Sequence, residues 1–396
     1  MSEVISEVSK PAKPPIWNDP VYRALFFQAL VLSGVIALGA FLINNTLDNL
    51  ARQGIASGFG FLDTTAGFSI LMSLIDYTEA DTYGRTFFVG LLNTLLVAGI
   101  GVFFATILGF LIGVARLSNN WLLSKMATVY VETFRNIPLL LQIFFWYFGV
   151  LRNLPQPKQS AAMFESFFLN NRGLYSPMPV FEDGFALVTW AFVAAIVIIF
   201  FMARWARKRQ EATGQLFHTV YASIGLLIIL PLLAGIITGF PMSWSYPELK
   251  GFNFKGGIRI IPELMSLTLA LSIYTATFIA EIVRSGIMAV SHGQTEAAYA
   301  LGLRPGPTLR LVVIPQALRV IIPPLTSQYL NLTKNSSLAA AIAYPDLVLV
   351  FGGIVLNQTG QAVEVLSITM GVYLTISLLI SAFMNWYNKK MALVER

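Results

Sequence analysis

The chain has 396 residues, of which 56% are hydrophobic and only 12% are charged, and its formal net charge is +6 at pH 7. The charged fraction is about half that of a typical soluble domain, so the composition excludes an ordinary soluble protein and indicates a polytopic membrane protein. With no cysteine and only two histidines, the sequence offers no disulfide framework or thiolate metal site, and little for a zinc site or a Ser-His-Asp triad.

The N-terminal quarter predicts three segments. Residues 1–21 are polar and Pro-rich, which predicts a cytoplasmic tail. Residues 22–43 are apolar, uncharged from position 24 on and longer than a signal-peptide core, so we expect an uncleaved first transmembrane helix. Residues 44–86 carry five acidic side chains and predict an acidic external loop.

Further apolar runs follow, each close to the roughly 20 residues that a membrane span needs. They lie at 87–115, 136–151, 184–203, 224–238, 264–288, 338–356 and 366–386. With the first run they predict an all-α, polytopic helix bundle of about eight spans. The third run reaches the necessary length only if it begins upstream, with Glu132 and Arg135 near its cytoplasmic end.

The run at 338–356 is the least regular of these segments. Pro315, Pro323 and Pro324 precede it, and we expect them to break the chain there, because proline removes a helical hydrogen bond. Pro345 and Asp346 fall inside the run. A broken backbone at membrane depth is tolerated only where protein buries it or where it lines a water-filled path.

Lys and Arg are distributed unevenly between alternate loops. With a cytoplasmic N-terminus, only eight fall outside: Arg52, Arg85, Arg152, Lys158, Arg172, Lys250, Lys255 and Arg259. This bias predicts that both termini are cytoplasmic, with a C-terminal tail at 388–396. The net positive charge therefore follows membrane topology, and we expect no nucleic-acid partner.

Residues 289–315 form a polar helical stretch within the apolar C-terminal half. Its marked positions are Gly293, Gln294, Glu296, Ala297, Ala298, Gly302 and Pro315. Small alanines allow another protein to approach the backbone closely, and Glu296 offers it a charged anchor. Gly302 can adopt the left-handed conformation that ends a helix, and Pro307 suits the first turn of a second helix. Ser291 and Gln294 have the spacing of a capping box.

This stretch resembles the EAA loop of ATP-binding-cassette (ABC) importer permeases, which is the cytoplasmic docking surface for an ATPase. An amphipathic helix at the membrane interface is the alternative that needs no partner. From about residue 88 to 387 the chain is similar to the polar amino acid uptake branch of that family. The similar segments are Asn93-Thr94, 131–140, 280–287 and 332–338.

The resemblance implies an ABC importer type I permease fold with cytoplasmic coupling helices and a transmembrane domain at 87–387. Residues 152–256 insert two extra spans, and with the first helix and its loop they resemble enlarged permease subunits of general L-amino acid or glutamate/glutamine importers. The insert ends in a Gly-rich segment at 251–257, which is also similar to those subunits. An external hairpin is the alternative interpretation of this segment.

The resemblance also implies the partners and the location. They are a cytoplasmic ABC ATPase dimer, a second homologous and different permease subunit, a periplasmic amino-acid-binding protein and the lipid of a bacterial inner membrane. The chain has no Gly-x-x-x-x-Gly-Lys-Ser/Thr loop, so we expect ATP and Mg²⁺ on the separate ATPase, no cofactor here and no catalytic residue. The implied function is L-amino acid import, broad-range or of the glutamate/glutamine type.

Polar residues near the membrane give two further sets of candidates. The candidates for the substrate path are Asn331, Lys334, Asn335, Ser336 and Ser337, whose amide, hydroxyl and ammonium groups can bind an amino acid head group. A snorkelling lysine at a helix end is the alternative for Lys334. Candidates for structural or gating ion pairs, at a spacing of three residues, are Glu132 with Arg135 and Glu281 with Arg284.

Two other classes of membrane protein compete with the permease. An ion-coupled secondary amino acid transporter would use a central carboxylate, for which Asp346 is the candidate. An intramembrane enzyme would need a nucleophile or a metal cluster, which two distant histidines, His218 and His292, and no cysteine do not supply.

Overall fold

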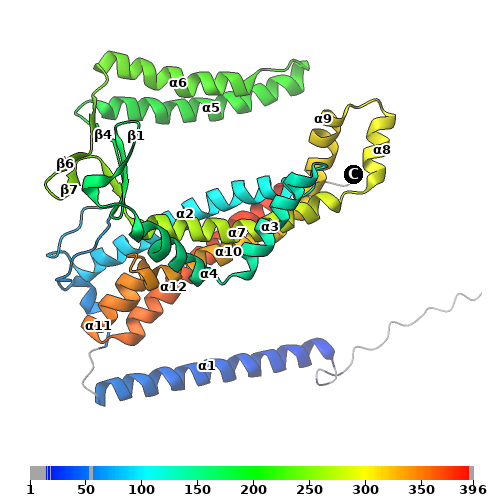
Figure 1. Cartoon of the computed structure of the whole chain (residues 1–396). Helices are drawn as coiled ribbons and strands as arrows, with labels where there is room; N and C mark the ends of the chain where they lie inside the picture. Colours follow the sequence, from blue (N-terminus) through cyan, green and yellow to red (C-terminus); the bar gives the residue numbers. More distant parts are fainter. Residues whose placement is uncertain (1–14, 16, 18, 53–56, 392–396) are drawn as a thin grey trace, which may run out of the picture.

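The computed structural model describes residues 15, 17, 19–52 and 57–391, and it is dominated by long helices (Figure 1). The tail predicted at 1–21 falls mostly outside the described residues, as do residues 392–396 of the predicted C-terminal tail. The all-α helix bundle predicted from the apolar runs is confirmed. Seven helices among the described residues are long and apolar enough to cross a membrane, or eight if one bent pair forms a span.

The first two spans lie where the apolar runs predict them but are longer. Helix α1 (Pro20–Arg52) continues beyond residue 43, and α2 (Tyr83–Ala115) begins before residue 87. The Thr82 hydroxyl accepts a hydrogen bond from the Arg85 N–H at 3.3 Å and so caps the start of α2. The segment between them carries a short 3₁₀ helix, η1 (Phe59–Asp63). Helix α1 lies apart from the bundle (Figure 1).

The third span is bent rather than continuous. Helix α3 (Trp121–Asn136) and the following helix, α4 (Leu139–Phe144) with the π-helical η2 (Phe145–Val150), meet at an angle of 103°. The bend falls at Ile137-Pro138, because the ring of a proline pushes the preceding residue into an extended conformation, here φ −90° and ψ 126°. If this pair of helices forms the third span, the span begins upstream and includes Glu132 and Arg135, as predicted, but it is bent.

The insert contains a helical hairpin and a small β subdomain. Helices α5 (Phe185–Thr213) and α6 (Thr219–Thr238) pack against each other and stand away from the bundle (Figure 1). The main sheet is antiparallel and has the strand order β1-β2-β3-β8, and β4 pairs with β5 in a separate two-stranded sheet. These strands are β1 (Ala161–Met163), β2 (Phe167–Asn170), β3 (Gly173–Ser176), β4 (Met178–Phe181), β5 (Met242–Ser245) and β8 (Ile258–Ile260).

The Gly-rich segment at 251–257 lies in a β-hairpin, as predicted. Strand β6 (Glu248–Lys250) pairs antiparallel with β7 (Asn253–Lys255), and Gly251 supplies the turn at a φ of +71°. A 3₁₀ turn, η4 (Pro157–Gln159), lies before β1 and contacts β2 and β7.

Helix α7 (Pro262–Met288) is the centre of the bundle and packs against α2, α3 and α4. Helix α2 approaches it closely through glycines that have no Cβ. A Cβ at Gly113 would lie 2.7 Å from the Ala280 carbonyl oxygen, and one at Gly109 would strike Ile279. Small residues at this interface let the two backbones pack directly, which is the usual source of helix association in lipid.

The seventh span lies earlier in the chain than the apolar run at 338–356 predicts. One apolar helical segment covers 305–342: α9 (Pro305–Thr308), the π-helical η5 (Leu309–Val313), α10 (Ile314–Asn335) and the 3₁₀ helix η6 (Ser336–Ile342). Helix α10 packs against α7 and α12 (Ala362–Met391), the last span. The predicted break at the prolines is therefore wrong.

Local geometry explains how the helix passes its prolines. Before Pro315 the turn widens, and the Ile314 N–H donates to the Leu309 carbonyl five residues earlier. Pro323 and Pro324 lie on the exposed side of α10, opposite the buried Ile321, Ile322 and Leu325. Transmembrane helices accommodate proline by such local adjustments.

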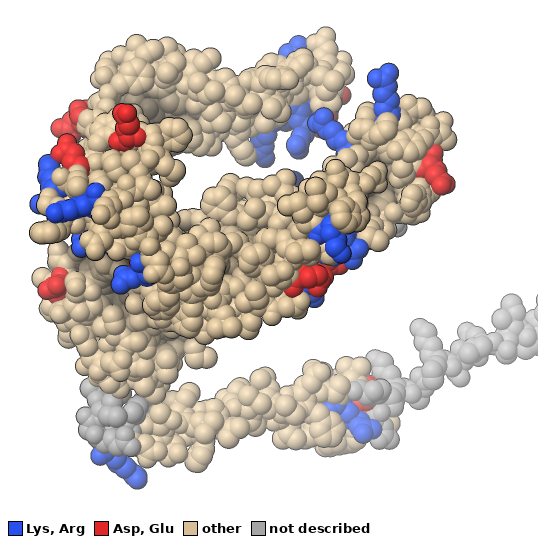
Figure 2. Space-filling view, viewed as in Figure 1, with Lys and Arg blue, Asp and Glu red and all other residues tan. Residues whose placement is uncertain are grey.

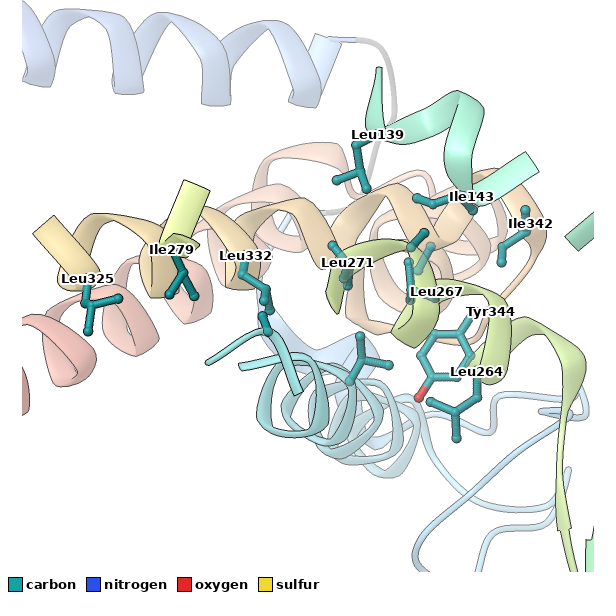
Figure 3. Close-up of a cluster of buried hydrophobic side chains, with 14 of the residues drawn as sticks. Leu139, Ile143, Leu264, Leu267, Leu271, Ile279, Leu325, Leu332, Ile342 and Tyr344 are labelled. Atoms are coloured by element: carbon teal, nitrogen blue, oxygen red, sulfur yellow. The ribbon is translucent and has the colours of Figure 1, made fainter. Parts of the chain in front are cut away.

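Residues 343–361 form a short hairpin instead of a span. Ala343 turns the chain at a φ of +59°, and the π-helical η7 (Val348–Val355) with α11 (Leu356–Thr359) leads to α12. Tyr344 lies with Leu264 and Leu267 in the main hydrophobic cluster, drawn in Figure 3. The hairpin thus packs into the core of the bundle.

Candidate functional site

The polar stretch at 289–315 folds into a helical hairpin of α8 (His292–Ala300) and α9, which we call the coupling hairpin. Gly302 has a φ of +77°, and its N–H donates to the Tyr299 carbonyl at 2.9 Å. The Leu303 N–H donates to the Ala298 carbonyl at 3.1 Å, so α8 ends in a Schellman motif. The predicted helix-ending role of Gly302 is confirmed.

The start of α8 differs from the predicted capping box. Ser291 occupies the N-cap position, but its side chain makes no capping hydrogen bond. The Gln294 side chain instead accepts a hydrogen bond from the Gln316 amide at 3.3 Å. This contact ties the first turn of α8 to the beginning of α10, so the hairpin is linked to a membrane span.

The coupling hairpin has a buried side and an exposed side. Ala298 and Thr308 are buried between its halves, while Glu296 and Ala297 are exposed. Leu301 is 82% exposed at the tip. The exposed side of the coupling hairpin therefore presents both a charged and an apolar side chain. Sequence analysis did not mark Leu301, although an apolar residue within a polar stretch was the available signal.

A charged cluster lies where α2 ends beside α7. The predicted pair of Glu281 and Arg284 is confirmed, with an N–O distance of 2.6 Å, and Arg116 at the C-terminal cap of α2 forms a second ion pair with Glu281. One carboxylate thus joins two helices. The sequence did not reveal Arg116, because it lies far from Glu281 in the chain.

The second predicted pair does not form. Glu132 and Arg135 are both exposed, and no ion pair joins them in the described part of the chain. The guanidinium of Arg135 lies instead 5.4 Å from the centre of the Phe278 ring on α7, a cation–π contact. Helix α3 ends at Asn136, just before the bend. Glu132 and Arg135 therefore lie near the end of a short helix and not within a continuous span.

Helix α10 exposes a polar stripe within a membrane span. Ser327, Asn331 and Lys334 are exposed and recur at helical spacing, so they share one face. In lipid, such groups face protein or a water-filled path. Two other predicted path residues are less exposed than this stripe. Asn335 is partly buried, and Ser336 is fully buried, with its hydroxyl donating to the Thr333 carbonyl at 2.7 Å. The structure thus separates Ser336 from the stripe.

A hollow of about 470 Å³ lies beside this stripe. It is lined by Lys334, Ser337, Val348, Thr369, Met370, Tyr373, Leu374 and Ser377. Two of the predicted path residues, Lys334 and Ser337, therefore meet polar groups of α12 that sequence analysis missed. Those groups lie in an otherwise apolar helix, and only the fold shows which side of α12 faces α10.

Asp346 lies deep in the hairpin behind this hollow and is fully buried. Its carboxylate accepts a hydrogen bond from the Leu349 N–H at 2.9 Å and one from the Tyr373 hydroxyl at 3.4 Å. The first bond caps the start of the helical segment that follows, which is a structural task.

Helix α2 holds this hairpin through Asn93 and Thr94, both buried. The Asn93 amide donates to the Pro345 carbonyl and to the Met72 carbonyl, each at 2.9 Å. The Thr94 hydroxyl accepts a hydrogen bond from the Leu347 N–H at 3.0 Å. The hairpin, α2 and the loop between α1 and α2 therefore meet at one polar junction.

The distribution of charge marks one end of the molecule. Figure 2 shows several Lys and Arg at the end that carries the coupling hairpin and the tip of the α5–α6 hairpin, while at the β-subdomain end Lys and Arg are mixed with Asp and Glu. Near that tip, Arg204 and Arg209 lie over the rings of Phe200 and Trp205. Basic side chains at the same end of several helices are the pattern that the positive-inside rule describes.

Comparison with known proteins adds a family and close relatives. The model of the family described as "Binding-protein-dependent transport system inner membrane component" matches residues 195–393. The chain is 58% identical to YhdX of Escherichia coli K12, covering 96% of both chains. It is also 58% identical to the general L-amino acid transport system permease protein AapQ of Rhizobium johnstonii, over 96% of this chain and 94% of the relative.

A third relative is more distant. The chain is 46% identical to the glutamate/glutamine/aspartate/asparagine transport system permease protein BztB of Rhodobacter capsulatus, and the alignment covers 96% of each chain. All three alignments include the insert and the first helix. The enlarged architecture is therefore shared with these relatives.

Proposed function

Because the chain belongs to the family of binding-protein-dependent transport system inner membrane components, as an ABC transporter permease, we propose that it imports L-amino acids across a bacterial inner membrane. The names of AapQ and BztB support a broad range of amino acids or a glutamate/glutamine type of range. The chain provides the translocation path, and a separate ATPase supplies the energy.

The coupling hairpin is the proposed docking surface for that ATPase. Its exposed Glu296 and Leu301 give the partner one charged and one apolar anchor, and the contact of Gln294 with Gln316 carries movement of α8 to α10. ATP and Mg²⁺ belong to the ATPase dimer. An ATPase that binds the outward-open and inward-open states with different affinity biases the equilibrium between them.

The polar stripe of α10 supports a second permease subunit. Ser327, Asn331 and Lys334 would be unfavourable against lipid, so a homologous and different permease chain covers this face and encloses the path. In that path Lys334 attracts the carboxylate of the amino acid, and the hydroxyls of Ser337 and Tyr373 line the adjoining hollow. The exposed apolar faces of α1, α5 and α6 contact lipid.

The basic end of the bundle supports cytoplasmic placement of the coupling hairpin and of both termini. The β subdomain then lies on the periplasmic side, where an amino-acid-binding protein delivers the solute. The observation that carries the coupling role is the exposure of Glu296 and Leu301 on a hairpin that is hydrogen-bonded to a membrane span.

The test is ATP-driven amino acid uptake in vesicles that contain all candidate subunits. Replacing Glu296→Lys reverses the charge of the anchor, and we expect uptake and ATPase co-purification to fall by about tenfold or more, because a like or unpaired charge at an interface costs several kcal/mol. Glu211→Lys is the matched control, since Glu211 is an exposed acidic residue at the tip of the α5–α6 hairpin.

Size-exclusion chromatography checks that each variant remains folded. Unchanged ATPase binding by Glu296→Lys would remove this residue as an anchor. Uptake that needs an ion gradient and no ATP would overturn the ATP-driven importer itself.

A further inference from the structure

The α5–α6 hairpin carries a dense group of basic side chains near its tip, apart from the coupling hairpin and the α10 stripe. We call this group the basic tip, and it consists of Arg204, Arg207, Lys208 and Arg209, all exposed. Arg204, Arg207 and Lys208 are three and four residues apart, so they share one face of α5. Glu211 follows closely, yet no carboxylate forms an ion pair with the basic tip in the described part of the chain.

The basic tip begins where α5 would leave the hydrocarbon layer of a membrane. Residues 185–203 carry no charge, and a helix needs about 20 residues to cross the apolar core of a bilayer. Arg204 is the next residue, and α6 carries no charge along its whole length. With these runs across the bilayer, the basic tip lies at the level of the lipid headgroups.

The long sides of this hairpin are open to lipid. Helices α5 and α6 pack against each other, and only 6% of the span window of α5 and 11% of that of α6 are buried. The hairpin stands away from the bundle (Figure 1). Lipid that surrounds the hairpin therefore brings its headgroups next to the basic tip.

Aromatic rings position two of the guanidinium groups. The Arg204 guanidinium carbon lies 4.9 Å from the centre of the Phe200 ring, and that of Arg209 lies 5.4 Å from the Trp205 ring. The Trp205 ring meets the edge of the Phe217 ring at 5.5 Å between centres, which ties α5 to the turn before α6. A guanidinium over a ring uses its face, so the N–H groups at its edge remain able to bind phosphate oxygens.

Most donors of the basic tip are unused within the chain. Arg209 donates to the Gln215 side chain at 2.8 Å, and the other three cations make no side-chain hydrogen bond among the described residues. Charge-assisted N–H bonds to phosphate are strong, and arginine forms them in pairs. Trp205 and Phe217 at the same level match the aromatic belt that faces the headgroups in membrane proteins.

We propose that the basic tip binds the phosphate headgroups of anionic phospholipids, on the side of the membrane assigned above to the cytoplasm. Arg204, Arg207 and Lys208 bind the phosphates along one face of α5, and Trp205 lies among the headgroups. Clusters of four or more cations next to a span select anionic lipid, because a zwitterionic lipid carries an ammonium group that offsets its phosphate. The proposal rests on the membrane placement given above and does not depend on which solute is imported.

An acidic face of the ATPase is the competing occupant. The depth of the basic tip favours lipid, because its first cation directly follows the apolar run and no polar spacer carries the tip beyond the headgroups.

The test places the assembled transporter in nanodiscs of phosphatidylcholine mixed with phosphatidylglycerol. Bromine on a lipid chain quenches a tryptophan that the lipid touches, and it is placed either on phosphatidylglycerol or, at equal mole fraction, on phosphatidylcholine. The chain has seven tryptophans, so each sample is compared with its Trp205→Phe counterpart to isolate the signal of Trp205. We expect phosphatidylglycerol to be preferred at Trp205 by about tenfold or more, because four cations act on its headgroup together.

Removing the charges should remove this preference. With all four residues of the basic tip changed to Gln, we expect the two lipids to quench Trp205 equally. The matched control changes four exposed cations near the other end of the hairpin to Gln and keeps the preference; these are Arg152, Lys158, Arg172 and Lys255. High salt tests the unmodified chain, and we expect the preference to fall strongly at about 1 M, where charges are screened beyond about 3 Å.

Two results would overturn the proposal. One is equal quenching of Trp205 by the two brominated lipids in the unmodified transporter at low salt. The other is weak quenching by both lipids, together with loss of ATPase capture in the variant with four Gln residues, since a partner protein would then cover the basic tip.

Uptake is a separate question. Absence of ATP-driven uptake in the unmodified transporter would defeat the importer function, while the quenching measurement would still decide whether the basic tip binds anionic lipid.

Discussion

Helices α1 and α7 are both candidate membrane spans, yet they sit at opposite extremes of packing. In α7, 61% of the membrane-spanning window is buried, whereas in α1 the corresponding share is 0%. The more apolar of the two is α1, the exposed one. High hydropathy therefore does not by itself indicate membership of the protein core.

The polar side chains of α7 explain this order. The Glu263 carboxylate accepts a hydrogen bond from the Tyr147 hydroxyl at 2.7 Å, the Ser266 hydroxyl donates to the Ile143 carbonyl at 2.9 Å, and Glu281 binds Arg116 and Arg284. Each partner except Arg284 comes from another helix. These protein partners lower the cost of carrying polar groups in a buried span, and a span in lipid has no such partners.

The largest effect is expected when one glycine is replaced at the interface of α2 with α7 and one is replaced on α1. Gly113→Leu places a side chain where even a Cβ would lie 2.7 Å from the Ala280 carbonyl oxygen of α7, and we expect a loss of about 3 kcal/mol or more in unfolding free energy. Gly34→Leu on α1 is the matched control, because a Cβ there meets nothing within 4 Å. Unfolding of each purified variant in SDS measures the difference.

Equal stability of the two glycine variants would contradict the close packing of α2 on α7. A large loss in Gly34→Leu would instead reveal a protein partner on α1 that the single chain does not provide.

A smaller effect is expected from the charged cluster. Glu281→Gln leaves Arg116 and Arg284 without their carboxylate, and we expect the unfolding free energy to fall by about 1–3 kcal/mol, since the two cations lose their charged acceptor. Glu248→Gln is the control, because Glu248 pairs with Lys250 at the exposed surface of the β subdomain and should contribute about 0–1 kcal/mol.

Thermal stability by fluorescence-detected chromatography checks the order of these two changes. If Glu248→Gln were the more damaging substitution, the joining of α2 to α7 by Glu281 would lose its support.

Prediction from sequence succeeded where one local rule was sufficient. Long apolar runs located α1, α2, α5, α6, α7 and α12, and the freedom of glycine to adopt a positive φ located the end of α8 at Gly302. For α10 the proline rule of soluble helices misplaced the span, because a widened turn before Pro315 and an exposed position for Pro323 let the helix continue.

The missed parts of the site depend on contacts between distant residues. Strands of three or four residues, as in the β subdomain, are too short for an alternating pattern to stand out. The placement of Lys334 and Tyr373 around one hollow, and the ion pair of Arg116 with Glu281, follow only from helix packing. The exposure of Leu301 likewise depends on which side of α8 packs against η5.

The finest test compares one hydroxyl in each helix. Ser266 on α7 is fully buried and donates to the Ile143 carbonyl of α4, whereas Thr46 on α1 is exposed and donates to the Leu42 carbonyl of its own helix. For Ser266→Ala we expect a loss of about 0.6 kcal/mol, the typical value for an interhelical hydrogen bond in a membrane protein. For Thr46→Ala we expect no measurable loss, since that bond joins no second helix. Matched SDS unfolding curves measure both losses. A larger loss for Thr46→Ala than for Ser266→Ala would mean that the hydrogen bond of Ser266 to α4 does not stabilise the bundle.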